Sequence, residues 1–176
     1  MKFQFVPELV KTDLEAVNQK EAITSLVTLL RKEGCVQDDY ARLVLEREQQ
    51  YPTGLQTKGA AIAMPHAFDE RIKDSHVAIG ILKDAVSFHN MEDMEESLNV
   101  HIIFLLAVGQ AHEQLEMLKI LMGLFQEETM LQKMLATHSS LLSILARFPA
   151  FLRLLHLHLH LINKHCRKVQ VNDISF

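Results

Sequence analysis

Ala60-Ala61-Ile62-Ala63-Met64-Pro65-His66 is an apolar run that ends abruptly in Pro-His. Pro65 fixes its own φ, holds Met64 in extended geometry and offers no backbone N–H. We therefore expect a buried strand over residues 60–64 that stops at Pro65 and delivers the His66 imidazole to its end. Functional groups of α/β proteins gather where strands end, so His66 is the first candidate site residue.

A second histidine follows a second apolar run. Residues 100–108 are almost wholly apolar, which is typical of a central strand covered on both faces. His112 comes just after this run, in Val108-Gly109-Gln110-Ala111-His112. We expect the two imidazoles to converge on one pocket, an arrangement that suits phosphoryl or proton chemistry.

The rest of the chain predicts helices that enclose a set of strands. Apolar residues at helical spacing predict helices over residues 20–31, 40–50, 112–126, 127–136 and 139–147. Strands are also expected over residues 77–82 and 86–88 and around Phe3 and Phe5. The acidic segment 90–99 is predicted to be a surface loop. The sequence thus predicts an α/β fold, with a mixed β-sheet sandwiched between helices (α/β/α).

Size and composition exclude several classes of protein. A chain of 176 residues makes one domain, or one domain with a tail. The formal net charge of −4 argues against general nucleic-acid binding, which needs a basic surface. We see no signal-peptide pattern and no apolar run of the ~18 residues expected of a membrane span. Cys35 and Cys166 lack metal-binding spacing and are expected to be reduced thiols, so we expect a cytoplasmic protein.

The C-terminal tail differs in kind from the rest. Leu155-His156-Leu157-His158-Leu159-His160-Leu161 alternates strictly, so a strand would place its three histidines on one face. Such a face is either a metal site, or simply an amphipathic edge strand, a helix extension or a poorly ordered tail. No carboxylate or thiolate stands close enough to complete a ligand set, so we expect neither a metal nor a cofactor.

A phosphoryl carrier makes demands that these residues can meet. Its imidazole must be mostly neutral near pH 7, as a ring with an ordinary pKa of ~6.5 is. The ring must also face solvent, because a protein partner has to reach it. Donors must hold the phosphoryl oxygens. His112, near a helix start, offers an N–H and free backbone amides, and Arg47 offers a planar two-pronged donor. The plainer alternatives are a structural histidine and a solvated helix arginine.

Three motifs together resemble a known family. Leu45-Glu46-Arg47-Glu48, Tyr51-Pro52-Thr53-Gly54-Leu55 and Ala61-Ile62-Ala63-Met64-Pro65-His66 are similar to the enzyme IIA components of the bacterial phosphoenolpyruvate:sugar phosphotransferase system, fructose/mannitol class. The run 103–108 followed by His112 fits the same order. The resemblance covers roughly residues 5–147, so we expect an enzyme IIA-like domain over 1–147 and an atypical C-terminal tail over 148–176.

The resemblance implies a function. His66 would accept a phosphoryl group from the phosphocarrier protein HPr and pass it to an enzyme IIB in sugar uptake. His112 would steady the phosphoryl group, and Arg47 would lie at the same pocket. The chain would be a cytoplasmic phosphotransferase that carries phosphohistidine, and it would reach a membrane permease only through its partners. The family fold is a mixed sheet between helices.

Some features depart from the family pattern or leave alternatives open. Ala67 follows the histidine where many relatives have Gly, and the acidic segment 90–99 hints at a galactitol-like branch. One alternative is a regulatory module of the nitrogen type, whose phosphorylation at His66 controls protein partners. Another is a metal-dependent hydrolase that uses His66, His112 and the tail histidines, although no HExxH motif occurs.

Overall fold

Six strands form one mixed sheet in the computed structural model, which describes residues 6–126 and 128–136. Their order is β1-β5-β6-β3-β2, and β4 pairs with β6. The pairs β5–β6 and β2–β3 are antiparallel, whereas β1 runs parallel to β5, and β3 and β4 run parallel to β6. The strands are β1 (Val10–Leu14), β2 (Gly54–Gln56), β3 (Ala61–Ala63), β4 (His66–Phe68), β5 (His76–His89) and β6 (Ser97–Val108).

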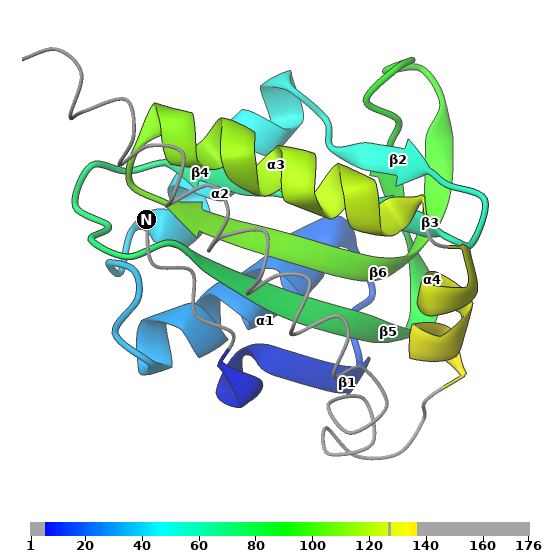
Figure 1. Ribbon diagram of the computed structural model, residues 1–176, viewed down its shortest axis with the longest axis horizontal. Helices are drawn as coiled ribbons and strands as arrows, with labels where there is room; N and C mark the ends of the chain where they lie inside the picture. The colour runs from blue at the N-terminus through cyan, green and yellow to red at the C-terminus, as the bar shows by residue number, and fades with distance from the viewer. Residues whose placement is uncertain (1–5, 127, 137–176) are drawn as a thin grey trace, which may run out of the picture.

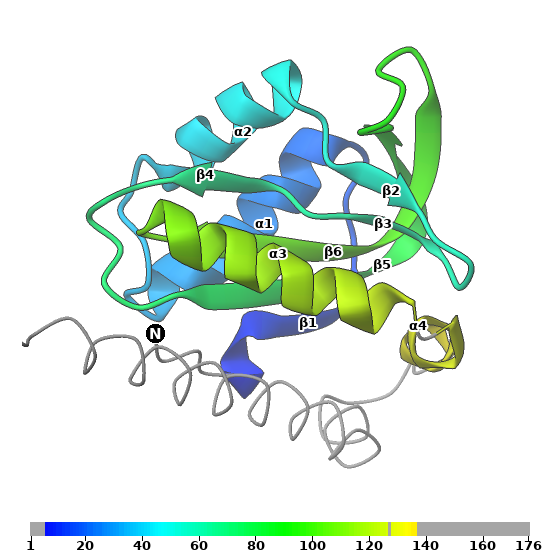
Figure 2. The same ribbon diagram turned by 45° about the horizontal axis from the view of Figure 1, so that its top comes forward.

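Helices cover both faces of this sheet, as Figures 1 and 2 show. A short 3-10 helix, η1 (Pro7–Leu9), leads into β1. The helices α1 (Gln19–Lys32) and α2 (Tyr40–Gln50) pack on one face, and α3 (Ala111–Phe125) and α4 (Glu128–Leu135) pack on the other. The Asn18 side chain caps α1 by accepting a hydrogen bond from the Glu21 N–H, and Gly34, at φ +70°, follows its C-terminus. The expected α/β/α sandwich is confirmed.

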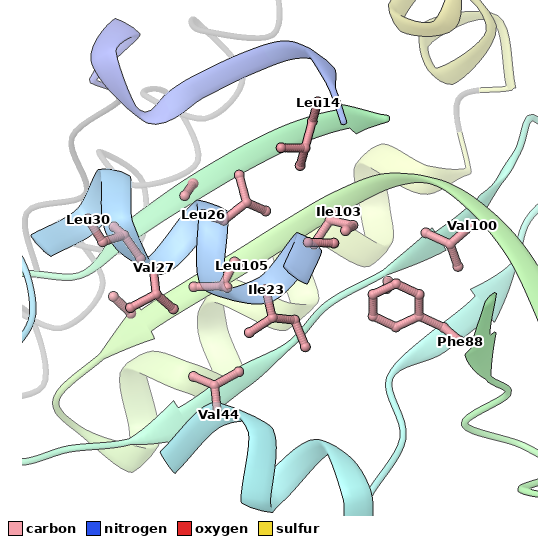
Figure 3. Close-up of a cluster of buried hydrophobic side chains, with 14 of the residues drawn as sticks. Leu14, Ile23, Leu26, Val27, Leu30, Val44, Phe88, Val100, Ile103 and Leu105 are labelled. Atoms are coloured by element: carbon pink, nitrogen blue, oxygen red, sulfur yellow. The ribbon is translucent and has the colours of Figure 1, made fainter. Parts of the chain in front are cut away.

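Strand alternation divides the buried side chains between two cores. Ile103 and Leu105 of β6 point toward α1, where Figure 3 shows them beside Ile23 and Leu26. Phe104 belongs to the opposite core and stacks at a tilt on Phe125 of α3, with ring centroids 4.9 Å apart. Both faces of β6 are therefore covered, which is why its sequence is apolar almost throughout.

β3 and β4 lie on one continuous line beside β6. Ile62 pairs with Ile102 and His66 with Leu106, so the register is the same before and after Pro65. The prediction that the strand stops at Pro65 is thus wrong in part: the ladder is interrupted because Pro65 has no N–H, but the chain stays extended. The Pro65 carbonyl still accepts a hydrogen bond from the Leu106 N–H at 3.0 Å.

Most of the other predicted helices and strands occur in the structure, with some changes in their bounds. The four helices predicted between residues 20 and 136 are confirmed to within one residue at each end. The strands predicted over 77–82 and 86–88 are one strand, β5, with an irregular register between Ile81 and Val86. The predicted loop 90–99 is shorter, because β6 begins at Ser97. The strand around Phe3 and Phe5, the helix 139–147 and the tail 148–176 lie outside the described residues.

None of the helices within residues 6–126 and 128–136 has both the length and the apolar composition needed to cross a bilayer.

Candidate active site

A pocket of about 330 Å³ lies where α2, the β3–β4 line, α3 and the β5–β6 loop meet. Arg47 lines it from the last turn of α2, and Met64 and His66 line it from the β3–β4 line. Met91 and Met94 come from the β5–β6 loop, and Leu118 comes from α3. The structure thus brings two of the three predicted site residues, Arg47 and His66, to one pocket.

The His66 ring is held at one nitrogen and free at the other. Its Nδ1 lies 2.7 Å from the Met64 carbonyl oxygen. A carbonyl only accepts hydrogen bonds, so Nδ1 carries the proton and Nε2 keeps its lone pair. Nε2 is buried and has no hydrogen-bond partner among the described residues. Nε2 is therefore the nitrogen available for chemistry.

Burial keeps this imidazole neutral. His66 is only 5% exposed. Burial lowers the pKa of the ring from 6.5 to about 4; the hydrogen bond to Met64 opposes this change, and the Arg47 charge adds to it. The ring is thus uncharged near pH 7. The expectation of a solvent-facing ring is wrong in this structure, because the ring is reached through the pocket and not on an open surface.

The Arg47 side chain also enters the pocket. It is half-buried, and its guanidinium carbon lies 5.7 Å from the centre of the Tyr51 ring. Burial lowers the pKa of Arg47, and its Nη1 is buried with no hydrogen-bond partner in the described part of the chain. The alternative of a solvated helix charge therefore does not fit. An unpaired buried donor beside a neutral imidazole is suited to binding an anion.

Tyr40 fixes α2 against the strand that carries His66. Its hydroxyl oxygen lies 2.7 Å from the Leu106 carbonyl oxygen and also accepts a hydrogen bond from the Ala67 N–H at 3.3 Å. Ala67 itself packs in the core on the α1 and α2 face, whereas Met64 of the same line belongs to the opposite core. The Ala67 methyl group therefore fills core space on the α1 and α2 face.

Glu48 is a buried carboxylate that sequence reasoning missed as a site residue. It is 3% exposed and accepts hydrogen bonds from the Thr53 N–H at 3.0 Å, the Thr53 hydroxyl at 2.8 Å and the Gln19 side-chain amide at 3.0 Å. Burial raises the pKa of Glu48 to about 7, while the Thr53 hydrogen bonds and the Arg47 charge oppose the rise. The available signal was its spacing from Tyr40 and Val44, which puts it on the buried face of α2.

The β5–β6 loop, residues 90–96, was also missed as part of the site. The Met91 N–H donates to the Gly54 carbonyl at 2.8 Å, which ties the loop to β2 (Figure 1, upper right). A Cβ on Gly54 would come within 2.5 Å of the His89 carbonyl oxygen, so this close approach requires glycine. The loop brings Met91 and Met94 to the pocket, both about half exposed.

His112 is the second residue of α3, the helix that also contributes Leu118 to the pocket. The side chain of His112 is not among the parts that the structure describes. No group of three metal-ligating side chains occurs within the described ranges, and the tail histidines lie outside them.

Comparisons with known proteins identify the family of the chain. Residues 4–147 match the family model "Phosphoenolpyruvate-dependent sugar phosphotransferase system, EIIA 2". The galactitol-specific EIIA component of Escherichia coli K12 is 26% identical over 127 residues, which are 72% of this chain and 83% of that protein.

Solved structures show the same fold. The nitrogen regulatory protein IIA-Ntr of Neisseria meningitidis is 26% identical, with a TM-score of 0.66 over 80% of this chain and 93% of its own. The mannitol IIA of Escherichia coli, solved in complex with phosphorylated mannitol IIB, is 23% identical, with a TM-score of 0.66 over 82% of this chain and 99% of its own. The resemblance inferred from the three motifs is confirmed: the chain belongs to the EIIA 2 family of the phosphoenolpyruvate-dependent sugar phosphotransferase system and is a phosphotransferase.

Proposed function

We propose that His66 is the phosphoryl acceptor and that Nε2 is the atom that reacts. In the forward step the Nε2 lone pair attacks phosphorus, an N–P bond forms, and the bond between phosphorus and the ring nitrogen of phosphorylated HPr breaks. Transfer to an enzyme IIB reverses these roles at His66. The observation that carries the proposal is the free Nε2 in the same pocket as the unpartnered Nη1 of Arg47.

The other two candidates act on the phosphoryl oxygens. Arg47 binds them through its planar guanidinium, which supplies the positive charge and positioning that phosphoryl transfer needs. His112 steadies the same group from the start of α3, where free backbone amides also favour an anion. The neutral state of His66 supports a nucleophilic role, because a protonated imidazole has no lone pair to offer.

The partners follow from the relatives. The mannitol IIA was solved with phosphorylated IIB, which supports transfer from this chain to a IIB protein. We propose that the chain acts in the cytoplasm and reaches a membrane permease only through such a partner, without binding nucleic acid. The family match supports a IIA domain over residues 1–147, with residues 148–176 as an appended tail.

A reconstituted labelling experiment tests this function. The protein is incubated with labelled phosphoenolpyruvate, enzyme I and HPr, and IIB proteins are then added one at a time. We expect acid-labile label on the wild type that moves to a matching IIB, and no label on His66→Ala. His89→Ala, at an exposed histidine outside the pocket, should accept label like the wild type. Full labelling of His66→Ala would disprove the assignment.

A further inference from the structure

A chain of hydrogen bonds leads from a buried carboxylate to the reactive ring. Glu48 Oε2 accepts from the Thr53 hydroxyl at 2.8 Å, and Thr53 Oγ1 accepts from the Met64 N–H at 3.2 Å. The Met64 carbonyl in turn faces His66 Nδ1 at 2.7 Å. We propose that Glu48 and Thr53 are positioning residues that fix the Met64 backbone, and through it the Nδ1–H tautomer of His66. This proposal rests on the proposed function, because it concerns the nucleophile of that reaction.

The Glu48 carboxylate determines which group donates in each hydrogen bond between Glu48, Thr53 and Met64. Above its pKa of about 7 Glu48 is ionised and only accepts, so the Thr53 hydroxyl donates to Glu48 and keeps a lone pair for the Met64 N–H. Two further donors, the Thr53 N–H and the Gln19 amide, hold Glu48 in place. A threonine hydroxyl could otherwise rotate to donate elsewhere, so Glu48 removes an ambiguity that Thr53 alone would leave.

The backbone of Met64 connects Thr53 to His66, because its N–H binds Thr53 and its carbonyl faces His66 Nδ1. Its N–H is held by Thr53 through both the hydroxyl and the carbonyl oxygen, each at 3.2 Å. Pro65 restricts Met64 to extended geometry, so the carbonyl on its other side has little freedom to turn. A fixed carbonyl can satisfy only a protonated Nδ1, which leaves Nε2 as the nucleophile.

The tautomer of His66 can be read directly. Two-bond proton–nitrogen correlation spectra of protein labelled with ¹⁵N-histidine separate the Nδ1–H and Nε2–H forms in the unphosphorylated protein at pH 7.5. We expect the wild type to be in the Nδ1–H form. Thr53→Val keeps the shape but removes the hydroxyl, and should give a mixture of both forms. Thr53→Ser restores the hydroxyl and should restore the single tautomer.

Rates of phosphoryl acceptance from phosphorylated HPr supply the second readout. Thr53→Val should accept roughly tenfold more slowly, as loss of one positioning hydrogen bond implies, and Thr53→Ser should recover. Thr57→Val is the matched control. The Thr57 hydroxyl donates to the Ala60 carbonyl at 2.7 Å in the turn between β2 and β3, outside the pocket. The Thr57→Val substitution should therefore leave both the His66 tautomer and the rate of phosphoryl acceptance unchanged.

The outcomes separate this proposal from the proposed function. A folded Thr53→Val protein with only the Nδ1–H tautomer overturns the relay, whatever its rate. If that variant does not fold, Thr53→Ala takes its place, because it also removes the hydroxyl that accepts from the Met64 N–H, and a folded Thr53→Ala protein with only the Nδ1–H tautomer likewise overturns the relay. A wild type that takes no phosphoryl group on His66 refutes the proposed function, while the tautomer measurement still tests the relay.

Discussion

Replacing His66 by Gln should change how the stability of the fold depends on pH. In the unfolded chain the imidazole takes up a proton as the pH falls below its ordinary pKa of 6.5, whereas in the folded protein burial delays this until the pKa of about 4. The unfolded state therefore binds more protons between these values, so the free energy of unfolding falls as the pH falls. The difference between the two pKa values corresponds to about 3 kcal/mol.

Glu48 acts in the opposite direction over nearly the same range. Burial raises the pKa of Glu48 from 4.5 to about 7, so the folded carboxyl takes up its proton before the unfolded one does. Its contribution to the free energy of unfolding is about 3 kcal/mol larger below pH 4.5 than above pH 7. The two groups thus nearly cancel in the wild type, and each shows its effect only when the other is removed.

Urea denaturation followed by far-UV circular dichroism at intervals from pH 8 to pH 4 measures these effects, and the chain contains no Trp for a fluorescence signal. We compare differences from the wild type, because other titrating groups then cancel. Relative to the wild type, His66→Gln should gain about 3 kcal/mol on acidification, and Glu48→Gln should lose a similar amount. Parallel curves for the wild type and His66→Gln would refute the conclusion that the folded ring is buried and neutral.

Three further substitutions test the construction of the site. Arg47→Lys keeps the charge but loses the planar fork, and should slow phosphoryl acceptance from HPr by roughly 10- to 100-fold in a single-turnover assay. Tyr40→Phe leaves buried backbone groups unpaired and should lower the free energy of unfolding by about 1–3 kcal/mol in urea titrations. Gly54→Ala forces the β5–β6 loop away from β2, which should cost about 1–3 kcal/mol and shift the NMR methyl signal of Met91.

The helices were predictable from the sequence, but the strands β1, β2 and β4 were not, and β1 and β2 show why. Helix periodicity and caps are local signals, and the turn residues 51–54 mark the end of α2 without reference to the rest of the chain. β1 has only two buried residues at its ends, Val10 and Leu14, and β2 has three residues in all. Both exist because a neighbouring strand, β5 or β3, offers them a hydrogen-bonded edge, and no local pattern records that.

The site was predictable in its residue types but not in its environment. The motifs indicated that Arg47 and His66 belong together, and the structure places both at one pocket. The burial of the ring depends on contacts between distant segments, such as the Tyr40 hydroxyl with the Leu106 carbonyl, 66 residues apart. The link from Glu48 through Thr53 to Met64 likewise joins a helix, a turn and a strand. Sequence spacing carries no information on such distances.

Burial has two consequences for the proposed role of His66 as the phosphoryl acceptor. An exposed imidazole near its ordinary pKa is partly protonated at neutral pH, whereas the buried His66 is neutral throughout that range. The same burial leaves His66 Nε2 and Arg47 Nη1 without partners among the described residues, which costs roughly 1–3 kcal/mol for each such group. In the function proposed above, a phosphoryl group would use Nε2 for its bond and would offer oxygen acceptors to Arg47 Nη1. Under the proposed function, the unphosphorylated pocket thus holds unsatisfied groups that a phosphoryl group would satisfy, and this would favour its acceptance without any further change in the fold.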